Sequence, residues 1–169
     1  MEKTYAVVRT DNMFGTDVRA GLVSVKYMGA DGNLAAEIEN GSVVKITELA
    51  EGEREVFVAV DPAADDKMTD IVLLAAPEVM YDERKKNLSD YINEAGKAVR
   101  GYRLHDGNTF GVTKEAFVGE APAVGSIVEL TAGTKLNVAK TATSGATTIG
   151  KIIDVEIAGR YTYYVVLIG

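Results

Sequence analysis

The chain contains no cysteine and no tryptophan, and only one histidine and three prolines among its 169 residues. Without cysteine it can form neither a disulfide framework nor a thiolate metal site, which is compatible with a reducing compartment. A single histidine also falls short of the several His or Cys ligands that a zinc site requires. The sequence therefore predicts a fold held by its hydrophobic core alone.

Long apolar runs are also missing. No stretch approaches the ~20 apolar residues that span a bilayer. The amino-terminal residues carry Glu2 early and lack the apolar region of a signal peptide. We expect neither secretion nor membrane insertion.

Positive charge is scarce. The formal net charge is -7, and the one basic run is Arg84-Lys85-Lys86. Because nucleic-acid affinity comes mostly from neutralising phosphates, we expect no nucleic-acid partner.

Glycine-led phrases that alternate apolar and polar side chains are abundant. The clearest pair is Gly41-Ser42-Val43-Val44-Lys45-Ile46 and Gly125-Ser126-Ile127-Val128-Glu129-Leu130, and a shorter relative is Gly107-Asn108-Thr109-Phe110-Gly111-Val112-Thr113. Alternation is typical of a half-buried strand, whose successive side chains point to opposite faces. The sequence predicts a mainly β fold, a small barrel or sandwich of short antiparallel strands with one short inserted helix.

Turn residues place the strands along the chain. Asp31-Gly32 predicts a hairpin between residues 23–27 and 34–38, because both residues tolerate positive φ. Further strands are expected at 43–49, 56–60, 71–75, 99–104 and 110–118. A second hairpin is predicted between 152–157 and 161–168, around Ala158-Gly159-Arg160.

The inserted helix is expected between Tyr81 and Gly96, where apolar residues recur near a helical period. Ser89 is the expected N-cap and Gly96 the expected stop. Residues 82–87 fit an exposed loop equally well.

The length suits one domain, because domains cluster around 100 to 150 residues. We expect residues 1–169 to form a single domain: an amino-terminal arm (1–17), a first β half (18–76), an insertion with the short helix (77–98) and a second β half (99–169).

Catalytic motifs are absent from the sequence. There is no Gly-x-Ser-x-Gly elbow and no phosphate-binding loop, and His105 stands beside Asp106 at an expected surface turn. We expect no enzymatic activity, no cofactor and no metal. The alternative, a metal-dependent hydrolase, requires Asp61, Asp65, Asp66 and His105 to converge on one pocket.

Tyr161, Tyr163 and Tyr164 crowd the last expected strand. Tyrosine combines a large apolar body with a polar tip, so this strand suits either a core edge or a protein interface.

Several segments together carry a resemblance to a known family: residues 39–46, 51–57, 76–81, 93–102 and 107–113, the segment from 124 to 130, and residues 150–153. These segments resemble the auxiliary head proteins of tailed bacteriophages, which decorate the capsid. The resemblance implies a protein made in the host cytoplasm that binds the outside of the head as a homotrimer at local threefold positions. Its partner would be the major capsid protein, and its role would be to stabilise the capsid lattice.

Two segments fit the repeating β pattern poorly, so we expect them to dock on a partner: the amino-terminal arm, Met1 to Asp17, and the segment from Asp82 to Lys97. They supply the predicted contact residues Tyr5, Val7, Arg9, Phe14, Arg84, Lys85 and Lys86. The alternative functions are a phage tail or fibre accessory and a carbohydrate-binding β module. An exposed aromatic platform on the last strand would favour sugar binding.

Overall fold

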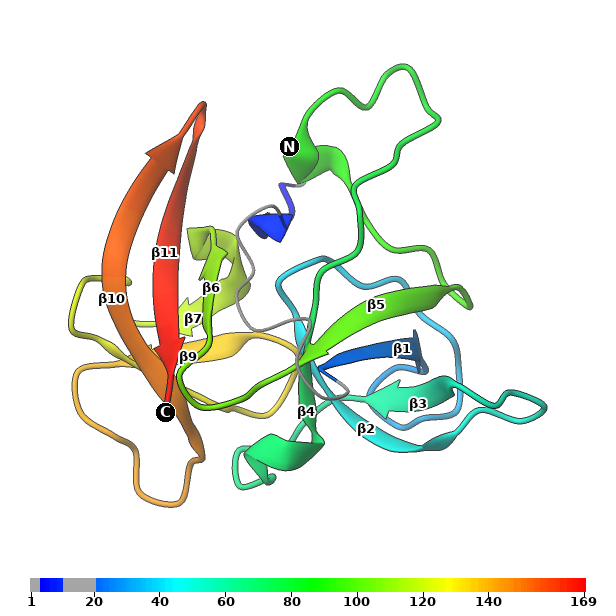
Figure 1. Ribbon diagram of the computed structural model, residues 1–169, viewed down its shortest axis with the longest axis horizontal. Helices are drawn as coiled ribbons and strands as arrows, with labels where there is room; N and C mark the ends of the chain where they lie inside the picture. Colours follow the sequence, from blue (N-terminus) through cyan, green and yellow to red (C-terminus); the bar gives the residue numbers. More distant parts are fainter. Residues whose placement is uncertain (1–3, 11–20) are drawn as a thin grey trace.

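The computed structural model describes residues 4–10 and 21–169, and this part of the chain is mainly β, which confirms the predicted fold class (Figure 1). Its strands are β1 Leu22–Tyr27, β2 Val43–Leu49, β3 Val56–Val60, β4 Ile71–Leu74, β5 Ala98–Arg103, β6 Thr109–Val112, β7 Phe117–Gly119, β8 Ile127–Glu129, β9 Leu136–Ala139, β10 Thr148–Ala158 and β11 Tyr161–Ile168. Three-residue 3-10 turns lie at Met68–Asp70, Leu88–Asp90 and Lys114–Ala116. Among the described residues no helix is long and apolar enough to cross a membrane.

The first five strands close into a barrel in the order β1-β3-β2-β4-β5. β1 pairs in parallel with β3 on one edge and antiparallel with β5 on the other. Because a strand has only two hydrogen-bonding edges, β3 and β5 occupy most of β1. Residues 34–38 form no strand beside it, although the Ala36 amide donates to the Tyr27 carbonyl at 3.4 Å. The hairpin predicted at Asp31-Gly32 is therefore wrong, and Ile38 instead forms an isolated bridge with Asn93.

The remaining strands form a six-stranded sheet in the order β6-β11-β10-β8-β9-β7. Its longest pairing is the β10–β11 hairpin, which the sequence predicts correctly. The register of this hairpin shifts between Ile152 and Asp154, which marks a bulge in β10. β6 lies at one edge of this sheet, and the amino-terminal arm extends that edge through an isolated bridge between Val8 and Val112 of β6.

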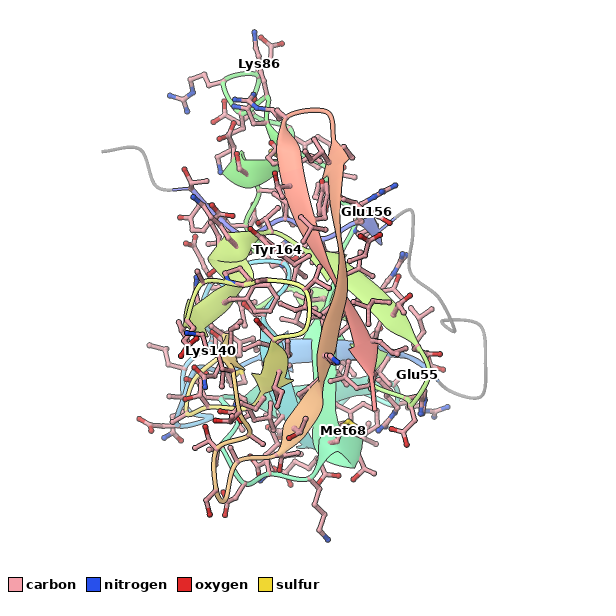
Figure 2. All side chains as sticks on the ribbon, turned by 90° about the vertical axis from the view of Figure 1, so that its left-hand side faces the viewer. Glu55, Met68, Lys86, Lys140, Glu156 and Tyr164 are labelled. Atoms are coloured by element: carbon pink, nitrogen blue, oxygen red, sulfur yellow. The ribbon has the colours of Figure 1, made fainter. Side chains whose placement is uncertain are left out.

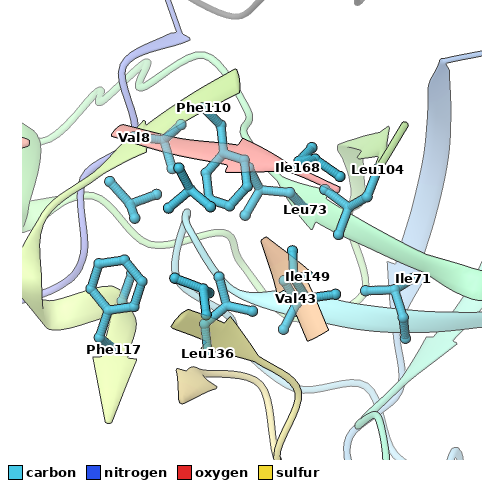
Figure 3. Packing of buried hydrophobic residues seen from close by; sticks show 14 of the residues in the cluster. Val8, Val43, Ile71, Leu73, Leu104, Phe110, Phe117, Leu136, Ile149 and Ile168 are labelled. Atoms are coloured by element: carbon cyan, nitrogen blue, oxygen red, sulfur yellow. The ribbon is translucent and has the colours of Figure 1, made fainter. Parts of the chain in front are cut away.

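Two hydrophobic clusters meet at β4, whose four residues are all buried. Val72 and Leu74 join the cluster inside the barrel. Ile71 and Leu73 join a second cluster, which packs the outside of the barrel against the six-stranded sheet (Figure 3). Because side chains of a strand alternate between faces, one apolar strand serves both clusters. The barrel and the sheet consequently share a core.

The repeated phrase occupies two strands of different sheets. Gly41 and Gly125 both have positive φ and both precede a strand, β2 in the barrel and β8 in the sheet. Each strand pairs antiparallel with a neighbour on both sides. The repeated sequence therefore specifies a turn followed by a central strand. The rest of the chain decides to which sheet that strand belongs.

The inserted helix is reduced to the single turn Leu88–Asp90. Its N-cap is Asn87, which forms a capping box with Asp90, and the expected cap Ser89 lies inside the turn. Beyond it, Asn93 exchanges backbone hydrogen bonds with Ile38 at 2.9 and 3.1 Å. These bonds use the amide and carbonyl groups that a continuing helix would need.

Candidate functional site

The β10–β11 hairpin extends well past the rest of its sheet (Figure 1). β10 pairs with β8 only over residues 148–151, whereas its pairing with β11 continues to Ala158. The projecting part carries exposed apolar side chains at every second position, Ile153, Val155 and Ile157, and Ile157 is 80% exposed. Such a group on a projecting strand is typical of a surface that contacts another protein.

Three segments far apart in the sequence meet at the tip of this hairpin. The Tyr5 amide donates to the Ser89 carbonyl at 3.1 Å. The Ser89 amide in turn donates to the Tyr161 hydroxyl at 3.3 Å, and Arg160 donates to the Asn87 side chain. We call this region the hairpin end: residues 4–10 of the arm, the loop 82–90 and the hairpin tip 156–163.

Arg9 connects the arm to the β10–β11 hairpin. Its Nη1 lies 2.8 Å from Oε2 of Glu156. Its guanidinium also lies 5.7 Å from the centre of the Tyr163 ring, within the range of a cation–π interaction. The backbone completes the attachment, because the Arg9 amide donates to the Gly111 carbonyl at 3.0 Å.

The predicted contact residues of the arm fall into different environments. Val7 is only 2% exposed, and its amide donates to Thr113 Oγ1 at 3.2 Å, so its side chain packs inside the protein. Tyr5 and Arg9 are half-buried and join the arm to the loop and the hairpin. Phe14 lies outside the described residues.

The basic run is fully on the surface of the loop, and Figure 2 places Lys86 at one extremity of the molecule. Arg84 is paired locally, because its Nε and Nη2 donate to the two carboxylate oxygens of Asp82 at 3.0 and 2.9 Å. These hydrogen bonds lower the pKa of Asp82 to about 2. Lys85 and Lys86 form no ion pair with a described residue, and they share the loop with the acids Glu83 and Asp90.

The three tyrosines of β11 are engaged within the fold. Tyr163 is 4% exposed beneath Arg9. Tyr164 packs edge-on against Phe117, with ring centres 6.1 Å apart, beside the shared core. Tyr161 accepts the hydrogen bond from Ser89 and lies 5.9 Å below the Arg160 guanidinium. The sequence predicted either a core edge or a protein interface for this strand, and Tyr163 and Tyr164 lie at a core edge.

The acidic side chains of the loop after β3 bind separate partners. Asp61 accepts a hydrogen bond from the Tyr27 hydroxyl, and Asp66 pairs with Lys45 and accepts from the Ala63 amide. In residues 4–10 and 21–169, no group of three or more His, Asp or Glu side chains is placed to hold a metal ion. The convergence on which the hydrolase alternative depends is not found there.

The sequence interpretation overlooked Ile157. The signal was present, because an isoleucine directly before the turn Ala158-Gly159-Arg160 must lie at the tip of a hairpin. Whether that tip is covered depends on its neighbours in the sheet, which the sequence does not report.

Comparisons of the chain with family models, with curated protein sequences and with solved structures found no match.

Proposed function

We propose that the protein is a structural binding module that attaches to the outside of a bacteriophage head through its hairpin end and stabilises the capsid lattice. The observation that supports this proposal is the convergence of the arm, the basic loop and the hairpin tip on one extremity of the molecule. The phage head as the target comes from the sequence resemblance.

The chemistry of this end describes the surface that it would fit. Ile157 supplies an exposed apolar anchor, and the hairpin end also carries the exposed cations Lys85, Lys86 and Arg160, together with the acids Glu83 and Glu156. Interfaces commonly combine a desolvated apolar centre with a polar rim. We infer that the major capsid protein offers an apolar depression bordered by carboxylates.

The arm contributes rigidity rather than apolar contact area. Its pairing with β6 and its contacts with the loop hold the hairpin in place. A pre-organised surface loses less conformational entropy on binding, so more of the contact energy appears as affinity.

The carbohydrate-binding alternative receives no comparable support. An exposed aromatic platform on the last strand would favour it, but the tyrosines there contact Arg9, Phe117 and Arg160.

The test is to add the purified protein to phage capsids that lack it. We expect co-sedimentation at a fixed stoichiometry and a higher melting temperature of the capsid. Light scattering of the free protein would show whether the implied homotrimer forms before docking. Failure of the wild-type protein to bind would refute the proposal.

Variants can locate the contact. Ile157→Asp, and separately Lys85→Glu with Lys86→Glu, should each weaken capsid binding about tenfold or more. Matched controls are Leu34→Asp, which is also a highly exposed apolar residue, and Lys140→Glu, which Figure 2 shows well away from Lys86. Equal losses in the variants and in their controls would count against the hairpin end as the docking surface.

A further inference from the structure

A second surface of the protein is an open cleft of about 1010 Å³ on the side of the barrel. Its floor is apolar and includes Val23, Phe57 and Val99. Exposed apolar side chains border it, among them Tyr81, which is 94% exposed. Figure 2 places Glu55, one of its lining residues, well away from Lys86. We call this feature the barrel cleft, and it is distinct from the hairpin end.

The barrel cleft is positively charged on a negatively charged protein. It is lined by Arg54, Lys97, Arg100 and Arg103 against only two acids, Glu55 and Glu94. None of these four cations forms an ion pair with any residue that the structure describes. Positive charge that no described residue pairs with, above an apolar floor, fits an occupant that combines carboxylates with an apolar side chain.

The chain itself carries such a segment at the end of β2 and in the connection that follows it. We call residues 48–53 the acidic turn. It contains Glu48, Glu51 and Glu53, all exposed, together with Leu49, which is 47% exposed. Figure 1 shows this connection projecting from the barrel on the side away from the β10–β11 hairpin.

The backbone shapes the turn as a compact protrusion. Gly52 has φ +78°, and the Glu53 amide donates to the Ala50 carbonyl at 3.0 Å. Positive φ favours glycine, so the tight turn is encoded locally. None of its three glutamates forms an ion pair with a described residue.

We propose that the barrel cleft of one copy binds the acidic turn of a second copy. The glutamates would face the cations of the cleft, and Leu49 would cover part of its apolar floor. Arg54 and Glu55 directly follow the turn and line the cleft, so the two surfaces are neighbours on one flank. Neighbouring complementary surfaces allow either a reciprocal exchange between two copies or a closed ring. This inference does not rest on capsid binding.

The experiment is sedimentation velocity of the purified full-length protein over a range of concentrations, without capsids. The wild type should self-associate. Reversing the cleft with Lys97→Glu and Arg100→Glu should weaken association about tenfold or more, and so should reversing the turn with Glu51→Lys and Glu53→Lys. The combined variant, with both surfaces reversed, should regain it because the charges are again complementary.

The control is Lys85→Glu with Lys86→Glu at the hairpin end, which should leave self-association unchanged. All substituted side chains are exposed, and circular dichroism with thermal unfolding verifies the fold. A monomeric wild type would overturn the proposal, as would reversed variants that associate normally. Loss on cleft reversal without loss on turn reversal would also overturn it, since the cleft would then have another occupant. The proposal would also be overturned if the combined variant did not regain self-association.

Discussion

Replacing Glu129 by alanine should remove the hydrogen-bonded centre that fastens residues 140–147 to the six-stranded sheet. Glu129 ends β8 and is 1% exposed. Its carboxylate accepts hydrogen bonds from Asn137 Nδ2 at 2.8 Å and from the Thr143 amide at 2.9 Å, and a third from the Thr143 hydroxyl. Alanine leaves all of these donors without their acceptor.

The magnitude follows from what the donors can do afterwards. A hydrogen bond to a charged group contributes about 1.5 to 3 kcal/mol, and a buried donor left unpaired costs about 1 to 3 kcal/mol. Thr143 is exposed and can hydrogen-bond to water instead, whereas Asn137 is half-buried beside the position of the lost carboxylate. We therefore expect Glu129→Ala to lower the free energy of unfolding by about 3 kcal/mol rather than by the full sum.

Urea unfolding followed by far-ultraviolet circular dichroism measures this change. With a slope of about 2 kcal/mol per molar, the midpoint should fall by about 1.5 M. The control is Glu120→Ala, because Glu120 meets Lys140 at 3.3 Å on the surface and should contribute at most about 1 kcal/mol. If Glu129→Ala is no more destabilising than this control, the reasoning fails. Hydrogen exchange at the Thr143 amide gives a second measurement, since its protection should disappear.

The same carboxylate makes stability depend on acid. Burial raises the pKa of Glu129, but the hydrogen bonds from Thr143 and Asn137 outweigh burial and lower it below its usual value of 4.5. The stabilisation is complete above that value and is lost as the pH falls through the folded-state pKa. We expect the difference in unfolding free energy between wild type and Glu129→Gln to shrink in acid. A difference that stays constant from neutral pH into acid would contradict this assignment.

Two further predictions concern backbone packing and a tyrosine. Gly150→Ala would place a Cβ 2.0 Å from the Leu167 carbonyl oxygen, so we expect a loss of about 3 kcal/mol. Thermal unfolding should show little change for Gly111→Ala, where the added Cβ meets ordinary contacts at 3.7 Å, and equal effects would refute the clash. For Tyr27, burial and the hydrogen bond to Asp61 raise the pKa of the phenol, so its stabilising effect persists at neutral pH and is lost in strong base. Spectrophotometric titration should find a late-ionising tyrosine that Tyr27→Phe removes, and an unchanged titration would exclude this role.

Local requirements of the backbone could be predicted from the sequence. Gly41, Gly107 and Gly125 each take positive φ and lead into a strand, as the repeated phrases indicate. Alternating side chains gave the bounds of β2 and β3 correctly, because a strand with one buried face needs that period.

Pairing between strands was predicted less well. The turn at Asp31-Gly32 forms with Gly32 at positive φ, but β1 pairs with β3 and β5, and residues 34–38 form no strand beside it. The expected helix fails for a related reason, since Asn93 pairs with Ile38. A short helix is marginal by itself, so long-range hydrogen bonds override its periodicity.

At the candidate site, the basic run and the arm were recognisable in the sequence, but their meeting with the hairpin was not. Tyr5, Ser89 and Tyr161 are joined only through contacts between distant segments. Ile157 was overlooked because its exposure depends on β8 ending its pairing before the hairpin does.

By itself, then, the sequence determined a cysteine-free, acidic, mainly β chain with glycine turns and alternating strands, since these follow from local geometry and composition. Only the tertiary structure decided how strands compete for edges, that β4 serves two cores, and that three distant segments form one exposed end. These outcomes depend on which hydrogen-bonding edges and apolar faces remain unoccupied after the rest of the chain has packed.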